Sequence, residues 1–153
     1  MAESSSVTII QADLEHLDQV TPLFDAYRRF YRKPADEARA QAFLRERLSN
    51  RDSLILFALD GASTALGFTQ LYPSFSSVRM RPLWILNDLF VVPEARGQGV
   101  GRRLMEAARE RAQAAGMVAL ALATEKNNTT AKALYESLGY QQDTAFDYYE
   151  LAL

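Results

Sequence analysis

The sequence contains no cysteine and a single histidine, His16, and these two shortages exclude several kinds of site. Without cysteine the chain has no disulfide framework and no thiolate to ligate a metal. One histidine cannot form a histidine-rich cluster, so we expect no metal site. The absence of cysteine also agrees with a reducing compartment, and we expect a cytoplasmic location.

Long apolar runs and blocks of one charge are also missing. No segment approaches the roughly 20 apolar residues that a membrane span needs, and residues 1–10 resemble neither a signal peptide nor an anchor. With 17 basic and 19 acidic residues the formal net charge is -2, which attracts neither nucleic acid nor an anionic membrane. Residues 27–33, YRRFYRK, interleave aromatic and basic residues, but helical spacing puts the aromatics on an apolar stripe. We therefore expect no nucleic-acid partner.

The composition supplies enough apolar residues for a core, because 48% of the 153 residues are hydrophobic. We expect one domain over residues 1–153, with residues 1–5 disordered. Strand patterns alternate with helical patterns along the chain, so we predict an α/β fold in which helices pack on a mixed sheet.

The expected elements follow from hydrophobic periodicity and from turn residues. Strands are predicted at 6–10, 53–59, 65–72, 82–92, 117–124 and 145–153. Helices are predicted after the N-cap Asp13 and at 35–49, 100–115 and 129–138. Pro22 is expected to kink the first helix or to split it in two. The continuous apolar run 117–124 is typical of a buried strand.

A glycine-rich stretch, PEARGQGVGRRLMEAA at residues 93–108, joins an apolar strand to an amphipathic helix. It is not the dinucleotide-binding pattern G-x-G-x-x-G, because Arg102 and Leu104 occupy the places of the third glycine. It is not a P-loop either, since the second glycine and the Lys-Ser/Thr pair are missing. The pattern that remains is R-x-x-G-x-G, formed by Arg96, Gly99 and Gly101.

The position of this loop favours an anion site. A helix N-terminus offers unsatisfied N–H groups and the positive end of its dipole, and glycines let a ligand approach the backbone. Arg96, Arg102 and Arg103 add local positive charge. A pyrophosphate fits these features, and the alternative is a glycine turn that caps the helix beside solvated arginines.

A second motif, N-x-x-A-x-x-L-Y, follows about 25 residues later and comprises Asn128, Ala131, Leu134 and Tyr135. Together the two motifs resemble the GNAT superfamily of acetyl-CoA-dependent N-acetyltransferases, nearest to the branch of diamine and histone-polyamine acetyltransferases. The resemblance implies the GNAT fold. That fold has a central mixed, twisted sheet of about 6–7 strands, with splayed fourth and fifth strands and about four flanking helices.

The resemblance also implies acetyl-CoA (coenzyme A) as the cofactor. In the family, the pantetheine pairs with the backbone of the fourth strand, and the pyrophosphate lies on N–H groups of the glycine loop. Matched to this sequence, the cofactor-binding residues are Leu89, Phe90, Val91, Arg96, Gly97, Gln98, Gly99, Val100, Gly101, Arg102, Asn128 and Tyr135.

The reaction implied is direct attack of a primary amine on the thioester, through a tetrahedral intermediate. By its place in the motif, Tyr135 is expected to be the general acid that protonates the leaving thiolate. Asp88, in the fourth strand, is the candidate general base, directly or through water. The alternatives are a buried helix aromatic for Tyr135, and a structural hydrogen bond or a contact with substrate charge for Asp88.

The acceptor is expected to be a small amine: a polyamine, a diamine or an amino-acid-like amine. Diamine acetyltransferases commonly carry a Glu-Asp pair where this chain has Asn87 and Asp88, so one acid is missing. The residues expected to bind the acceptor are Tyr27, Tyr31, Tyr72, Trp84, Asn87 and Asp88. Acetylation of peptide lysines or N-termini, and non-catalytic binding of acyl-CoA by a regulatory domain, stay open. The resemblance also implies a homodimer.

Overall fold

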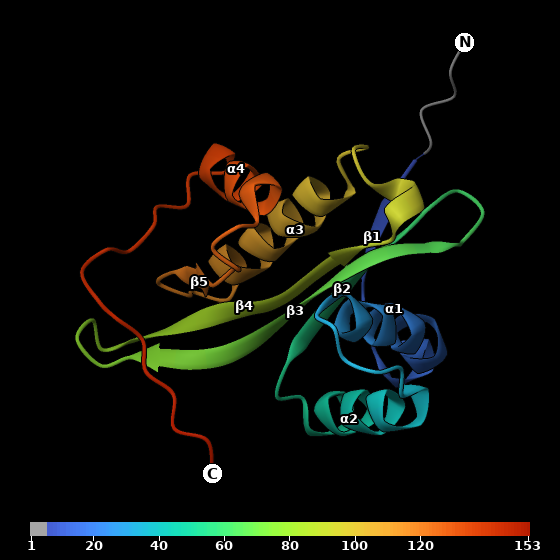
Figure 1. Ribbon diagram of the computed structural model, residues 1–153, viewed down its shortest axis with the longest axis horizontal. Coiled ribbons are helices and arrows are strands. Elements are labelled where there is room, and N and C mark those ends of the chain that lie inside the picture. The colour runs from blue at the N-terminus through green and yellow to red at the C-terminus, as the bar shows by residue number, and fades with distance from the viewer. Residues whose placement is uncertain (1–5) are drawn as a thin grey trace. The chain divides into compact units, whose positions relative to one another are not determined.

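The computed structural model describes residues 6–153, so the expected disorder of residues 1–5 lies outside the described residues. The chain divides into two compact units, Met1–Ala123 and Thr124–Leu153. The first unit holds the sheet together with the helices α1, α2 and α3 (Figure 1). The second unit holds α4, Thr129–Ser137, and the C-terminal segment.

Five strands form one sheet in the order β1-β2-β3-β4-β5. They are β1 Thr8–Gln11, β2 Leu54–Leu59, β3 Ala65–Ser76, β4 Arg81–Val91 and β5 Leu120–Leu122. The first four strands pair antiparallel with their neighbours, whereas β5 pairs parallel with β4. The predicted mixed sheet is therefore confirmed.

Helices cover both faces of this sheet. They are η1 Leu14–His16, α1 Leu17–Phe30, α2 Glu37–Asn50, η2 Pro93–Ala95 and α3 Val100–Ala114. Figure 1 shows α1 and α2 on one face and α3 on the other. Buried side chains such as Leu44, Phe57 and Phe68 form the core under α1 and α2. Among the described residues, no helix combines the length and the apolar character needed to cross a membrane.

Asp13 is a helix N-cap, as the sequence predicts, but it caps the short helix η1, which leads into an α1 that is not split at Pro22. The side chain of Asp13 accepts the N–H of Leu14 at 2.8 Å, and Nδ1 of His16 accepts the N–H of Asp13 at 2.9 Å. Pro22 is exposed inside a continuous α1, so the predicted division is wrong. Proline removes a single helical hydrogen bond there, while the buried Val20 and Leu23 hold the helix on the core.

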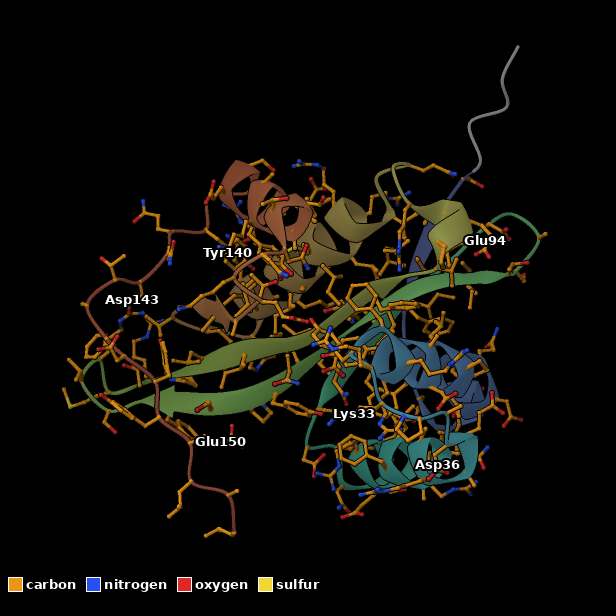
Figure 2. All side chains as sticks on the ribbon, in the orientation of Figure 1. Lys33, Asp36, Glu94, Tyr140, Asp143 and Glu150 are labelled. Carbon is orange, nitrogen blue, oxygen red and sulfur yellow. The ribbon has the colours of Figure 1, made fainter. Side chains whose placement is uncertain are left out.

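The loop between α1 and α2 is closed by a buried carboxylate. Asp25 is 3% exposed, and its Oδ1 accepts the N–H of Asp36, the N-cap of α2, at 2.8 Å. The N–H of Lys33 donates to the carbonyl of Arg28 at 3.0 Å. Lys33 and Asp36 are labelled in Figure 2. These bonds fix the chain just after Tyr31, the C-cap residue of α1.

The predicted strand at 145–153 and the count of six to seven strands are wrong, because residues 6–153 contain five strands. In an extended strand, Phe146 and Tyr148 would lie on one face, whereas Tyr149 and Leu151 would lie on the opposite face. The segment therefore has no continuous apolar face, and a strand without a partner is not stable.

The fifth strand is shorter and less buried than the sequence predicts. It covers Leu120–Leu122 rather than 117–124, and Ala121 is exposed. It pairs with β4 along one edge only, at Trp84–Leu86. With no second neighbour among the described strands, the apolar run is not the buried inner strand that its composition favours.

Candidate functional site

The outer half of β4, residues 87–91, has no partner strand on the side of β5 among residues 6–153. The parallel pairing stops at Leu86 with Leu122, whereas β4 continues to Val91. At that point β4 also bulges, because Gln70 pairs with Asp88 and Leu71 pairs with Leu86, which leaves Asn87 unpaired. The expected separation of the fourth and fifth strands is present, and it begins at the bulge.

The register shows which main-chain groups face the unpaired side. The N–H of Val92 donates to the carbonyl of Leu66 on β3 at 2.9 Å. Antiparallel pairing alternates, so the N–H and C=O of Phe90 also point to β3, while those of Leu89 and Val91 point to the unpaired side. Of the three strand positions expected to bind pantetheine, Leu89 and Val91 therefore present backbone groups to a ligand.

Gly67 allows β3 to approach this part of β4 closely. A Cβ at Gly67 would lie 2.6 Å from the carbonyl oxygen of Phe90 and 3.2 Å from Cα of Val91. Backbone atoms cannot yield as a flexible side chain can. We predict that Gly67→Ala lowers the free energy of unfolding by about 1 to 3 kcal/mol and weakens CoA binding, because β4 must shift.

Urea unfolding and CoA titration calorimetry check this prediction, with Gly61→Ala as the matched control. A Cβ at Gly61 meets nothing nearer than Oγ of Ser6 at 3.9 Å. Wild-type stability in Gly67→Ala would contradict the close approach.

The glycine loop leads into α3 through two left-handed residues. Gly97 has φ 76° and Gly99, the N-cap of α3, has φ 80°. The N-cap Gly99 makes no side-chain hydrogen bond to the helix within the described chain, and Arg103 donates the first helical hydrogen bond, to the carbonyl of Gly99 at 3.1 Å. The N–H groups of Val100 and Gly101 lie in the first turn of α3, which has no acceptor for them within the helix, and this is the arrangement of an anion site.

Arg96 ties this loop to the end of β4. Its Nε donates to the carbonyl of Val91 at 2.9 Å, and its guanidinium carbon lies 5.6 Å from the ring centres of both Phe30 and Phe90. The side chain thus occupies one of the acceptors on the unpaired side of β4. In this position Arg96 holds the loop beside the strand.

Asp88 lies in the sheet beneath α1. Its side chain shares a face with Phe90 and is 2% exposed. Oδ2 accepts Nε2 of Gln70 at 2.7 Å, and Oδ1 accepts Nδ2 of Asn87 at 2.7 Å. The hydroxyl of Tyr27 donates to the carbonyl of Asn87 at 3.4 Å and lies close enough to the Asp88 carboxylate to lower its pKa.

The burial of these groups opposes their ionisation. Burial raises the pKa of Asp88 above its ordinary value, while the neighbouring donors of Asn87, Gln70 and Tyr27 lower it. Burial, followed by the charge of Asp88, raises the pKa of Tyr27, and the same two causes raise that of Tyr72 to about 12. The site therefore contains the carboxyl of Asp88, whose pKa is raised, beside the phenols of Tyr27 and Tyr72, which stay protonated at neutral pH.

The structure gathers most of the predicted acceptor residues on one face. Tyr27 of α1 and Tyr31, its C-cap residue, contact each other edge to face, with ring centres 5.0 Å apart, and Tyr72 of β3 lies on the face of Asp88. Trp84 is not among them, because it pairs with Pro73 and so points to the opposite face from Tyr72. Gln70, which contacts Asp88 directly, was not among the predicted site residues.

In the second unit, the predicted residues lie on α4. Asn128 is the N-cap, and its Oδ1 accepts the N–H of Ala131 at 3.1 Å. The ring of Tyr135 lies 6.1 Å from that of Tyr140, whose N–H donates to the carbonyl of Tyr135 at 3.0 Å. Asn128 thus has a structural function within this unit.

The chain resembles known proteins along most of its length. The family model of the Acetyltransferase (GNAT) family matches residues 20–140. An uncharacterised N-acetyltransferase of Bacillus subtilis, YhfO, is 48% identical over 143 residues, 94% of this chain and 95% of that protein. The crystal structure of a probable acetyltransferase superposes with a TM-score of 0.90 at 41% identity, over 95% of this chain and 97% of the other.

More distant relatives differ in their acceptors. A D-amino-acid N-acetyltransferase of Saccharomyces cerevisiae, HPA3, is 34% identical over 52% of this chain and 49% of that protein. Other relatives are named for thialysine and for L-methionine sulfoximine. Similarity therefore identifies acetyl transfer but not one acceptor.

Proposed function

Because the chain belongs to the acetyltransferase (GNAT) family, we propose that it transfers the acetyl group of acetyl-CoA to the nitrogen of a small amine. The observation that carries this proposal is the unpaired outer half of β4 next to the uncapped start of α3. The strand β4 offers backbone groups to an extended amide ligand, and the start of α3 offers N–H groups to a pyrophosphate. Residues 1–153 would act as a single acetyltransferase domain.

The residues around this loop fit the donor. The N–H groups of Gly97, Gln98, Gly99, Val100, Gly101 and Arg102 would hold the pyrophosphate. Leu89 and the N–H of Val91 would pair with the pantetheine amides, and Arg96, bonded to the carbonyl of Val91, would keep the loop next to β4. Asn128 and Tyr135 are the proposed contacts from α4. When bound, acetyl-CoA supplies an activated acetyl group as a thioester.

Removing a proton from the acceptor is the task proposed for Asp88. An amine of pKa about 10.4 is neutral in about one molecule of 2,500 at pH 7, which corresponds to about 4 to 5 kcal/mol. Burial raises the pKa of Asp88 and so makes it a stronger base than an exposed aspartate. Asp88 would accept the proton directly or through a water molecule. Tyr135 would return a proton to the thiolate.

A small cationic acceptor fits the groups around Asp88. Tyr27, Tyr31 and Tyr72 offer aromatic rings to a cation, and Asp88 offers its charge. Asn87 replaces the second acid of the diamine enzymes, so the resemblance to the diamine branch has weak support. A D-amino-acid acetyltransferase among the relatives supports an amino-acid-like amine as one member of this class. Acetylation of peptides and non-catalytic binding of acyl-CoA are the alternatives.

A thiol-release assay with acetyl-CoA tests the proposal against polyamines, D- and L-amino acids and lysine-containing peptides. We expect turnover with at least one small amine and kcat/KM at least tenfold lower for the peptides. Turnover with peptides alone would favour the first alternative. CoA binding without turnover for any acceptor would favour the second. The cytoplasmic location and the homodimer stay predictions.

A further inference from the structure

Gln70 occupies a position where the sheet otherwise places core side chains. It lies on β3 two residues from the buried Phe68 and pairs with the buried Ile55 of β2. Its own side chain is 0% exposed. Phe68 and Ile55 both belong to the apolar core under α1 and α2, so an apolar residue would suit this position as well.

The amide of Gln70 is only half satisfied. Its carbonyl Oε1 is buried and has no hydrogen-bond partner in the described part of the chain. A buried acceptor without a partner destabilises a fold, and such departures from core packing concentrate at functional sites. The hydrogen bond that the amide does make is therefore the feature that accounts for a polar residue at this position.

That bond joins Gln70 to Asp88. Nε2 of Gln70 donates to Oδ2 of Asp88 at 2.7 Å, while Nδ2 of Asn87 donates to Oδ1 at the same distance. The two amides thus hold the two oxygens of one carboxylate. Asn87 is the exposed residue of the β4 bulge, whereas Gln70 approaches from within the sheet.

No cation among the described groups around the carboxylate balances its charge directly. The titratable groups that face it are Tyr27 of α1 and Tyr72 of β3, and Tyr31 at the C-cap of α1 raises the pKa of Tyr27. Arg47 of α2 acts on Tyr72, and its guanidinium is paired with Glu46 and Asp52. Neutral donors, rather than a positive charge, therefore stabilise the ionised carboxylate.

We propose that Gln70 is a positioning residue that keeps the Asp88 carboxylate ionised and oriented to accept a proton at neutral pH. This inference rests on the proposed role of Asp88 as the general base. A hydrogen bond donated to a carboxylate favours its charged form, so Gln70 limits the rise in pKa that burial causes. Without it, Asp88 would be protonated over more of the neutral range and would not act as a base there.

The test compares Gln70→Met with the wild type and with Thr69→Val. Methionine keeps the length of glutamine while removing both the donor to Asp88 and the unpartnered carbonyl, so the core retains its packing. Thr69 is the matched control, because it is also 0% exposed and donates through Oγ1 to the backbone carbonyl of Asp88 at 2.8 Å. Its removal leaves both carboxylate bonds in place.

Two readouts separate this role from a merely structural one. The first is the NMR titration of the ¹³C-labelled Asp88 carboxyl, assigned with Asp88→Asn. The second is the pH profile of kcat/KM. In Gln70→Met we expect the NMR midpoint and the acidic limb of the profile to move up together by about one pH unit. Activity should recover at high pH. Neither should move in Thr69→Val.

An unmoved midpoint in Gln70→Met would overturn the inference, and so would an equal loss of activity at every pH. If Gln70→Met does not fold, Gln70→Leu removes the same donor and leaves an apolar side chain that suits the surrounding core. The same upward displacement is then expected, because the lost hydrogen bond favoured the charged form of Asp88. The NMR titration needs no substrate, so it tests Gln70 even where the proposed function fails.

Discussion

Replacing Asp88 by asparagine is expected to lower kcat/KM about 100-fold to 10,000-fold while making the folded protein more stable at neutral pH. The activity falls because the proposed proton acceptor is lost. The stability rises because Asp88 is 2% exposed and its burial opposes the charge. Gln70 can turn its amide so that Oε1, which has no partner among residues 6–153, accepts a hydrogen bond from the new side chain.

The stability gain should depend on pH. Burial raises the pKa of Asp88 above its ordinary value of 3.8, so the native state binds this proton more tightly than the unfolded chain. The contribution of Asp88 to the free energy of unfolding is fully present below its ordinary pKa, and it is lost as the pH rises through its pKa in the folded protein. The free energy of unfolding should therefore fall less in Asp88→Asn than in the wild type as the pH rises above about 4.

Urea unfolding at several pH values, together with thiol-release kinetics, measures both effects. Asp18→Asn is the matched control, because Asp18 is exposed and its Oδ1 accepts Nε2 of Gln41 at 3.1 Å, a bond that asparagine can keep. It should change stability by no more than about 0.5 kcal/mol and leave activity intact. An Asp88→Asn variant with wild-type kcat/KM would exclude Asp88 as the base.

Replacing Tyr135 by phenylalanine is expected to lower kcat about 100-fold to 10,000-fold and to leave the affinity for acetyl-CoA nearly unchanged. The phenol, with an ordinary pKa of about 10, would protonate the thiolate late in the reaction. Removing one hydroxyl keeps the ring, which packs 6.1 Å from that of Tyr140. The fold of α4 should therefore persist.

Steady-state kinetics and CoA calorimetry on the same preparation check this expectation. Tyr149→Phe is the control, since Tyr149 is 94% exposed and should tolerate the change in both measurements. A Tyr135→Phe enzyme that turns over at the wild-type rate would remove the general-acid role. A parallel loss of CoA affinity would instead make Tyr135 a binding residue.

The elements that the sequence predicts well are those whose signals are local. Asp13 caps η1, and the glycine-rich stretch turns the chain into α3 through Gly97 and Gly99, which are left-handed. The elements that it predicts poorly depend on partners. Residues 145–153 have β-forming residues but no neighbouring strand, and Pro22 is tolerated because α1 is held by the core.

The candidate site shows the same division. A strand followed by a glycine loop and a helix indicates an anion site without any tertiary information. The bulge at Asn87 and the strand register are not visible in the sequence, and they decide that Trp84 points away from Tyr72. Gln70 was missed because two adjacent polar residues, Thr69 and Gln70, in the run ALGFTQLY do not show which of them faces the core. Only the structure shows that Gln70 is buried and donates a hydrogen bond to Asp88.

Calorimetric titration of CoA into the folded protein tests the central claim most directly, because every proposed step requires a donor site beside β4. We expect one CoA per chain, and at least tenfold weaker binding in Gly99→Val, since φ of 80° at the N-cap of α3 disfavours a branched side chain. A folded wild-type protein that binds no CoA at millimolar concentration would contradict the account.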